Sequence, residues 1–316
     1  MHAAPIVTVR AATLDDAPLI CDLLNAIDTI ETGRPETDLH TVEADLSHTE
    51  VDLEHDSWLA FEDGALVAYA LAWDDSGADR IDTDHYVLPE HQAAGERLLA
   101  LAEEWARERA DANGAPQAVV HLHLNQHPTL DTARLEARGW ERVRRYHVME
   151  RPLSAQADPV PQPPAGVTLR DCTAEADRRR VHALVEETFA AHFDHQRRGY
   201  EQWLEDIDGT RLDWSLVWIA SVDGVGDAAV LLSRNDRAAM GWVRNLGVRE
   251  EARGRGLGGY LLRHAFGTYA RLGRDSIGLG VDTLNASRAL SLYEAHGMRA
   301  HHAVDTWEAV LPARRG

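Results

Sequence analysis

Two short sequence patterns occur twice in this chain at almost the same spacing. Segments 7–10 and 167–170, Val-Thr-Val-Arg and Val-Thr-Leu-Arg, lie 160 residues apart, and each precedes an apolar-periodic helix. Segments 135–140 and 293–298 both read Glu-Ala-x-Gly after an apolar or aromatic residue, and they lie 158 residues apart. Two nearly equal offsets are typical of a duplicated domain, so the chain is predicted to hold two copies of one domain of about 150 residues.

A proline-rich segment separates the two copies. Residues 154–166 contain four prolines and no apolar period, which predicts a linker between domains 1–153 and 167–316. Each domain is long enough to bury its own core. The composition, with 44% hydrophobic and 27% charged residues, is that of a globular protein.

The composition also narrows the partners and the chemistry. A net charge of -20 repels nucleic acid and anionic membranes, so neither is an expected partner, and a polyanionic ligand needs a local positive site. The sequence has no apolar run of about 18 residues and no basic-then-apolar N-terminus, so a cytoplasmic protein is expected. The chain is expected to be a monomer or a homodimer. It contains no lysine, which excludes Schiff-base chemistry and lysine-dependent phosphate loops. Cys21 and Cys172 are expected to be unpaired thiols.

The order of elements predicts the fold class. Three consecutive short strands in the second copy imply an antiparallel meander, and a later strand-helix-strand crossover adds parallel pairing. Each copy is therefore expected to be an α/β (α+β) domain, with a mixed, mostly antiparallel sheet flanked by helices. The expected elements of the second copy are a strand at 167–170, helices at 175–192 and 199–207, strands at 216–222, 226–233 and 239–248, a helix at 255–272, a strand at 276–282, a helix at 287–296, and strands at 299–303 and 306–311.

The heptapeptide 253–259, Arg-Gly-Arg-Gly-Leu-Gly-Gly, fits two phosphate-binding patterns. Gly254, Gly256 and Gly259 fit the dinucleotide pattern G-x-G-x-x-G, and Asp275 lies near the position of a ribose-binding acid. The same heptapeptide fits R-x-x-G-x-G, the pattern of an acyl-coenzyme A loop. A dinucleotide fold has its glycine loop directly after the first strand of a parallel sheet, whereas here three hairpin-connected strands come first. The order of elements favours the acyl-coenzyme A loop.

Two blocks of sequence resemble the GNAT superfamily of N-acetyltransferases. Residues 246–262, LGVREEARGRGLGGYLL, resemble its acetyl-coenzyme A motif, and residues 281–298 resemble its second signature, N-x(6)-LY-x(3)-G. The first half of the chain joins this resemblance through the repeat. The two fused copies are similar in architecture to the tandem type typified by mycothiol synthase. The resemblance implies an acetyl-CoA-dependent N-acetyltransferase that acts on a small-molecule amine without a metal.

The resemblance also implies where the cofactor binds. A helix N-terminus offers unpaired N–H groups and the positive end of the helix dipole to a pyrophosphate, and glycines let these groups approach it closely. The pantetheine arm would pair with the backbone of the preceding strand, as an added strand does. The expected cofactor-binding residues are Leu246, Gly247, Val248, Arg253, Gly254, Arg255, Gly256, Leu257, Gly258, Gly259 and Asn285.

Attack of an amine on the acetyl thioester requires two proton movements. Tyr293 matches the tyrosine that protonates the departing thiolate in the family, and a phenol with a pKa of about 10 is a donor at neutral pH. Asn285 matches the family's asparagine, and capping of the helix that follows is an alternative role. A backbone N–H near Val248 would stabilise the oxyanion.

The base is left open by the sequence. Many relatives carry a carboxylate on the strand before the loop, but segment 241–248, Gly-Trp-Val-Arg-Asn-Leu-Gly-Val, has none. Asp282, His296, or a histidine acting through a water remain as candidates. The expected contacts with the acceptor are His192, Asp194 and His195, between the first two helices of the copy. Two histidines three residues apart also suit half of a metal site, but no other ligand cluster accompanies them.

The first copy departs from the family pattern. Aligning segment 87–97 with the second loop keeps one glycine, and it sets Gln92 opposite Arg253 and Arg97 opposite Gly258. Leu135 stands where Tyr293 does. These changes predict a degenerate first domain that helps to shape the substrate cleft, with the chemistry in the second domain. The alternative function for the whole chain is a non-catalytic acyl-CoA sensor.

Overall fold

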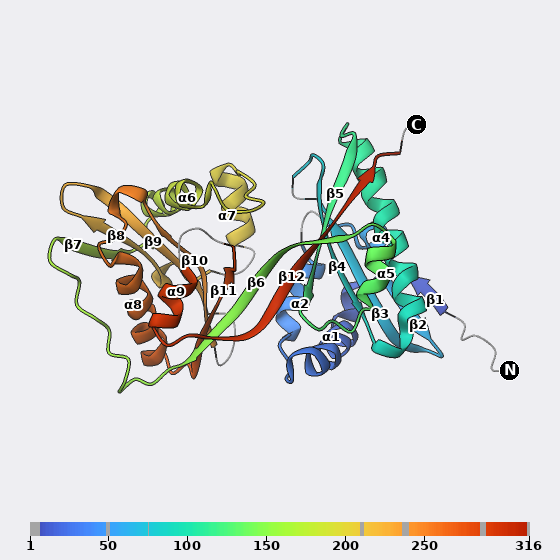
Figure 1. The fold of residues 1–316 in the computed structure, drawn as a ribbon, viewed down its shortest axis with the longest axis horizontal. Helices are drawn as coiled ribbons and strands as arrows, with labels where there is room; N and C mark the ends of the chain where they lie inside the picture. The colour runs from blue at the N-terminus through green and yellow to red at the C-terminus, as the bar shows by residue number, and fades with distance from the viewer. Residues whose placement is uncertain are drawn as a thin grey trace. The chain divides into compact units, whose positions relative to one another are not determined.

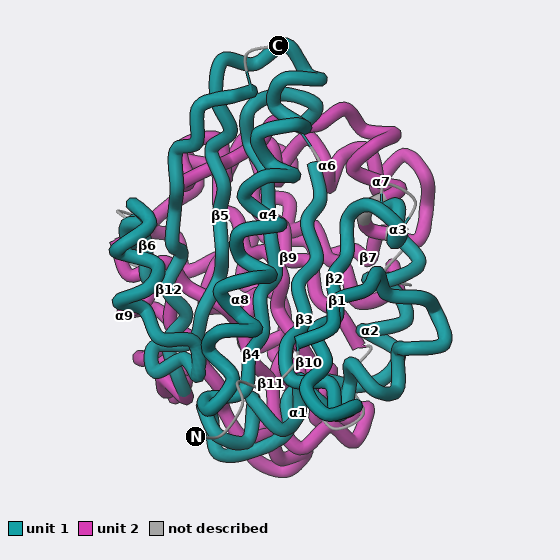
Figure 2. The backbone as a smooth tube through the Cα atoms, turned by 90° about the vertical axis from the view of Figure 1, so that its right-hand side faces the viewer, with its two compact units in different colours: residues 1–145, 302–316 teal, residues 146–301 magenta. Residues whose placement is uncertain are grey.

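The chain forms two compact units, which are coloured separately in Figure 2. Unit 1 comprises residues 1–145 and 302–316, and unit 2 comprises residues 146–301. The structure is a computed structural model. It describes residues 7–48, 51–74, 76–208, 212–235, 240–284 and 289–314.

Unit 1 is a mixed sheet with helices on both faces (Figure 1). Its strands are β1 (Val7–Arg10), β2 (Ser57–Glu62), β3 (Ala65–Trp73), β4 (Arg80–Val87), β5 (Gln117–Asn125) and the end of β12 (Arg299–Pro312). Its helices are α1 (Ala17–Thr32), α2 (Leu39–Leu46), α3 (Leu53–Asp56), α4 (Gln92–Ala112) and α5 (Thr132–Ala137). The strands follow the order β1-β2-β3-β4-β5-β12, and all neighbours pair antiparallel except β4 and β5.

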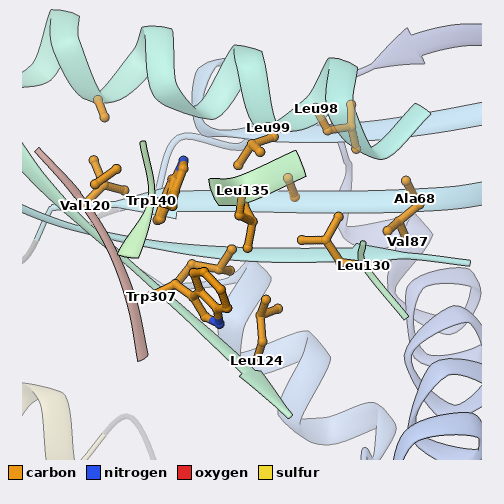
Figure 3. Packing of buried hydrophobic residues seen from close by; sticks show 14 of the residues in the cluster. Ala68, Val87, Leu98, Leu99, Val120, Leu124, Leu130, Leu135, Trp140 and Trp307 are labelled. Atoms are coloured by element: carbon orange, nitrogen blue, oxygen red, sulfur yellow. The ribbon is translucent and has the colours of Figure 1, made fainter. Parts of the chain in front are cut away.

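Each face of the sheet in unit 1 has its own core. Helix α4 buries apolar residues at three- and four-residue spacing, among them Leu98 and Leu99, against one face. Trp140 and Trp307 complete this core, and Figure 3 shows both indole rings between the sheet and the helices. Helices α1 and α2 cover the other face, where Tyr69 is buried.

Unit 2 repeats this plan. Its strands are the end of β6 (Glu141–Pro152), β7 (Val167–Asp171), β8 (Val217–Val222), β9 (Gly226–Arg234), β10 (Met240–Val248) and β11 (Ser276–Asp282). Its helices are α6 (Glu175–Phe189), α7 (Tyr200–Asp208), α8 (Leu257–Arg271) and α9 (Ala289–Ala295). The strand order is β6-β11-β10-β9-β8-β7, with parallel pairing between β10 and β11. One core packs beneath α8 and a second beneath α6 and α7.

The two halves of the chain exchange their last strands. β6 ends the first half, yet its residues from Tyr146 to Pro152 pair antiparallel with β11 of unit 2. β12 ends the second half, yet its residues from Val304 to Pro312 pair antiparallel with β5 of unit 1. Each sheet is therefore completed by a strand from the other half.

The expected fold class is confirmed, and the units differ from the expected domain ranges. The ranges 1–153 and 167–316 follow the order of the chain, whereas the exchange moves the last strand of each half into the other sheet. The two closing strands expected at 299–303 and 306–311 form one strand, β12. Among the described residues, no helix combines the length and the apolar character needed to cross a membrane.

The proline-rich segment packs against unit 2. Arg151 pairs with Asp158 at 2.6 Å, and Asp158 also accepts a hydrogen bond from the Ser154 N–H at 3.0 Å. A Cβ added to Gly267 of α8 would lie 2.7 Å from the backbone of Val160. The first half of the expected linker is thus held on the surface of α8.

Candidate active site

The sheet of unit 2 splits between β10 and β11. The two strands pair in parallel only from Met240 to Val243 on β10 and from Ser276 to Leu279 on β11. Beyond these residues, β10 continues to pair with β9, and β11 continues to pair with β6. The facing edges of the two strands therefore diverge toward their C-terminal ends.

A β-bulge lies at the point of divergence. The register between β10 and β9 shifts between Val243 and Asn245, so that Arg244 is the extra residue. Val243 pairs with Ser233, whose hydroxyl accepts a hydrogen bond from Tyr269 of α8. Asn245 pairs with Leu232, which belongs to the core beneath α6 and α7. Because a bulge turns two successive residues to one face, Arg244 and Asn245 both face α6.

The split opens into a cavity of about 540 Å³. The cavity extends from the diverging strands to the loop before α8 and to helix α9, all within unit 2. Its lining includes most of the residues expected to bind the cofactor. These are Leu246, Gly247, Val248, Arg253, Gly254, Gly256, Leu257, Gly258 and Gly259.

The glycine loop requires glycine at two positions. Gly254 and Gly256 have φ values of 77° and 78°, in the left-handed region that side chains with a Cβ rarely adopt. Gly256 is the N-cap of α8, and no side chain caps this helix end. The first N–H groups of α8 therefore face the cavity as a binding site for an anion. Arg253 lines the cavity beside them, whereas Arg255 is exposed outside its lining.

Tyr293 lies on α9 and lines the cavity. Its side chain is 7% exposed, and burial raises the pKa of its phenol to about 12. The phenol therefore carries its proton throughout the neutral pH range. Asn285, the other residue taken from the second signature, lies outside the described residues.

The residues expected to contact the acceptor are divided by the structure. His192 lines the cavity, and its ring packs against Phe189 with centroids 4.3 Å apart. His195 lies outside the lining, where its Nε2 is 3.2 Å from a carboxylate oxygen of Glu186. Asp194 is also outside the lining and accepts a hydrogen bond from the Gln196 amide.

The candidates for the base are divided in the same way. Asp282 lines the cavity with 8% exposure, and its Oδ1 accepts a hydrogen bond from the Leu284 N–H at 2.8 Å. His296 lies outside the lining. Its Nε2 accepts from Arg263 at 3.0 Å, so its Nδ1 carries the proton and donates to the Leu292 carbonyl at 2.8 Å. Both ring nitrogens of His296 are therefore engaged, and Asp282 is the better placed acid or base.

Comparisons with known proteins identify the family. Residues 213–299 match a family model described as "Acetyltransferase (GNAT) domain", and residues 21–134 match one described as "Acetyltransferase (GNAT) family". A mycothiol acetyltransferase of Beutenbergia cavernae is 32% identical over 250 residues, which cover 74% of this chain and 76% of that protein. The chain belongs to the GNAT family. It is an N-acetyltransferase that depends on acetyl-CoA.

Solved structures agree with the tandem GNAT architecture. A GCN5-related N-acetyltransferase from Sphaerobacter thermophilus superposes with a TM-score of 0.83 and 28% identity over 98% of both chains. A tandem GNAT protein from the clavulanic acid biosynthesis pathway superposes with a TM-score of 0.71 over 98% of this chain and 100% of its own, at 17% identity. The second likeness concerns the fold alone.

The GNAT fold of unit 1 has different residues at the matching points. Its parallel ladder ends at Thr83 and Leu122, as that of unit 2 ends at Val243 and Leu279. Counting from these ends, Asn125 corresponds to Asp282, and the Asn125 amide donates to Glu31 at 2.7 Å. Between β3 and β4 the register runs from Ala68 to Trp73 without a bulge.

The loop of unit 1 that matches the GNAT glycine loop is filled by a side chain. The Gln92 amide donates to the Pro89 and Thr129 carbonyls and accepts from the Asp131 N–H, at 2.8 to 3.1 Å. Leu135, the counterpart of Tyr293, is fully buried in the core. The Gln92 side chain thus links the start of α4 to Thr129 and Asp131.

Several cavity residues were missed by sequence reasoning. Tyr146 comes from β6, so the exchange of strands had to be known before it could be assigned to this GNAT site. Thr188 and Phe189, at the end of α6, also line the cavity. Thr188 lies so close to Gly247 that an added Cβ would be 2.1 Å from its hydroxyl. Arg244 lies in the strand whose lack of a carboxylate was noted, and its place in the cavity lining follows from the facing of that strand in the sheet.

Proposed function

We propose that this protein transfers the acetyl group of acetyl-CoA to the amine of a small molecule by direct attack, and that the chemistry occurs in unit 2. The observation that carries the proposal is the continuous cavity that joins the glycine loop to Tyr293. The corresponding positions of unit 1 hold Gln92 in the loop, Leu135 for the phenol and Asn125 for the carboxylate, which leaves unit 1 without either proton-transfer group.

The cofactor would bind along the split in the sheet. Its pyrophosphate would accept hydrogen bonds from the first N–H groups of α8, with Arg253 adding positive charge in an acidic chain. Its pantetheine arm would pair with the edge of β10 from Asn245 to Val248, which faces away from β9. This path brings the thioester to the bulge, where the cavity opens on both faces of the sheet.

The reaction moves one proton from nitrogen to sulfur. The amine nitrogen bonds to the thioester carbon, and a backbone N–H of β10 beside the bulge, rather than one near Val248, would stabilise the oxyanion. Asp282 accepts the proton that the amine loses. The carbon–sulfur bond then breaks, and the thiolate takes the proton of the Tyr293 phenol. The phenol, with its pKa of about 12, is regenerated from the proton held at Asp282 or from solvent.

The names of relatives support a small-molecule acceptor. Relatives of this chain are mycothiol acetyltransferases, including one from Geodermatophilus obscurus that is 29% identical over 96% of this chain. The rival function, an acyl-CoA sensor without turnover, was favoured only by the lack of a carboxylate on β10. Asp282 removes that argument, because the neighbouring strand β11 supplies a carboxylate to the same cavity.

The test is steady-state kinetics of Tyr293→Phe, with release of coenzyme A followed by a thiol reagent. Loss of the proton donor is expected to lower kcat by about 10²- to 10⁴-fold, while the dissociation constant for acetyl-CoA changes by less than about threefold. Asp282→Asn is expected to lower kcat with a loss of the pH dependence assigned to the base.

Tyr260→Phe is the matched control. Tyr260 lies on α8, is 1% exposed and lies outside the cavity lining, and its hydroxyl has no hydrogen-bond partner among the residues that the structure describes. This variant is expected to keep the full kcat. A Tyr293→Phe enzyme as fast as Tyr260→Phe would reduce Tyr293 to a packing residue, and tight binding of acetyl-CoA without any turnover of amines would favour the sensor.

A further inference from the structure

Arg244 shares one face of the split with Asp282. Arg244 follows Val243, which packs in the core beneath α8, so Arg244 faces α6, and its exposed side chain lines the cavity. On β11, Leu279 and Val281 belong to the core beneath α8, so the alternation along the strand turns Asp282 to the opposite face. Asp282 and Arg244 therefore both line the α6 side of the cavity, one with a carboxylate and the other with a guanidinium.

Two further polar side chains line this side of the cavity. Tyr146 is the register partner of Asp282 on β6, so the two side chains lie on the same face of the sheet. His192 approaches from the end of α6. The side of the cavity away from α8 thus carries several polar side chains beside Phe189, and the guanidinium of Arg244 adds a permanent positive charge to it.

The place of Arg244 does not suit a contact with the cofactor's pyrophosphate. Val248 lies four positions after Arg244 on β10, which corresponds to roughly 13 Å at about 3.3 Å per residue. The pyrophosphate loop follows Val248 and leads into α8, whereas Arg244 faces α6. The loop has its own arginine, Arg253, beside the helix N-terminus.

Unit 1 has an acidic residue, not an arginine, at the matching position. Counting one residue beyond the last pair of each parallel ladder, Thr83 and Val243, gives Asp84 in unit 1 and Arg244 in unit 2. The surrounding chain carries a net charge of -20, so a guanidinium at the acceptor side of the cavity is not a consequence of general composition. A positive charge at this point selects for a negative group on what binds there.

We infer that the acceptor of unit 2 is an amine that also carries a carboxylate, and that Arg244 binds this carboxylate while the amine lies toward Asp282. The inference rests on the proposed function, because it assigns the acceptor to the α6 side of the same cavity. The planar guanidinium pairs with a carboxylate through two parallel hydrogen bonds, which makes Arg244 a specificity-determining residue.

The test compares matched acceptors with and without the negative charge. The full-length enzyme is assayed for release of coenzyme A with glycine and glycinamide, β-alanine and β-alaninamide, and 4-aminobutanoate and 4-aminobutanamide. The wild type is expected to prefer the carboxylate in the best pair. Arg244→Ala is expected to lower kcat/KM for that carboxylate by about 10- to 100-fold, which is the effect of losing a charge-assisted hydrogen bond. The kcat/KM for the paired amide is expected to change by less than about threefold. Arg244→Lys is expected to recover part of the preference.

Arg253→Ala separates the two binding functions. It is expected to raise the KM for acetyl-CoA and to leave the ratio between the paired acceptors unchanged. The inference is overturned if the wild type uses the amides as well as the carboxylates, or if Arg244→Ala loses both members of a pair equally. Absence of any acetylated amine in the whole panel counts against the proposed function as well, so the two failures are told apart.

Discussion

Because the two halves exchange their last strands, a substitution in the last strand of one half is expected to destabilise the sheet and core formed by the other half. Trp307 lies on β12 at the end of the second half, but its ring is 7% exposed within the core of unit 1. Met149 lies on β6 at the end of the first half, but it is 1% exposed within the core of unit 2. Trp307→Ala is therefore expected to destabilise unit 1, and Met149→Ala to destabilise unit 2.

The size of each effect follows from burial. Removing a buried tryptophan costs roughly 3–5 kcal/mol, and removing a buried methionine costs roughly 2–5 kcal/mol. For a domain of this size, 1 kcal/mol shifts the melting temperature by about 2–4 °C, so losses of roughly 6–20 °C are expected after Trp307→Ala and roughly 4–20 °C after Met149→Ala. Val310→Ala is the control on β12, because the Val310 side chain is 51% exposed, and a change within about 0.5 kcal/mol is expected.

Hydrogen exchange read by mass spectrometry assigns the loss to a unit. Trp307→Ala should speed exchange in β3, β5 and α4 and leave α8 protected. Met149→Ala should speed exchange in β10, β11 and α8 and weaken the binding of acetyl-CoA measured by calorimetry. Faster exchange in unit 2 alone after Trp307→Ala would refute the strand assignment.

Two further predictions concern the loop and an acidic residue. Gly256→Val forces a β-branched residue to a φ of 78° at the N-terminus of α8, so the affinity for acetyl-CoA, measured by calorimetry, should fall at least about tenfold. The control is Gly273→Val, which has a similar φ of 76° at the other end of that helix and should leave the affinity unchanged. Equal affinity in the two variants would contradict the loop assignment. Burial, with Asp45 and Asp82 nearby, raises the pKa of Asp84 to about 7, above the value of about 3.9 for an unfolded chain. Stability contributed by the protonated form is therefore complete below about pH 4 and is lost as the pH rises through 7. Asp84→Asn should raise the melting temperature at pH 8.5 and leave it nearly unchanged at pH 4; an equal effect at both pH values would contradict this.

Local sequence signals were sufficient for the elements and for the glycine loop. Turn signals and apolar periods place β9 and α8 within a few residues of their observed bounds, because these depend on near neighbours in the chain. The repeat was visible for the same reason, since it needs only a comparison of the sequence with itself. Gly254 and Gly256 adopt the backbone conformation that makes glycine necessary in such a loop.

Sheet partners and side-chain direction were not predictable in this way. The residues of β6 and β12 contain no local signal that specifies which of the two sheets each strand joins. The exchange decides that Tyr146 joins the cavity of unit 2. The bulge turns Asn245 to the same face as Arg244, and strict alternation along β10 from Val243 would have turned every residue beyond Arg244 to the opposite face.

The exchange also explains why a first copy without its own proton-transfer groups is kept. β11 pairs with β6 along its whole length, from Ser276 to Asp282, so a chain that began at residue 167 would leave β11 as an unpaired edge beside the active site. The same fragment would lack Tyr146 on the acceptor side of the cavity. Asn125 and Leu135 of unit 1 stand where the proposed proton-transfer groups of unit 2 stand, and neither lies on β6. Under the proposed function, unit 2 therefore depends on the first half of the chain for its sheet and for part of its site, even though the chemistry is proposed for unit 2 alone.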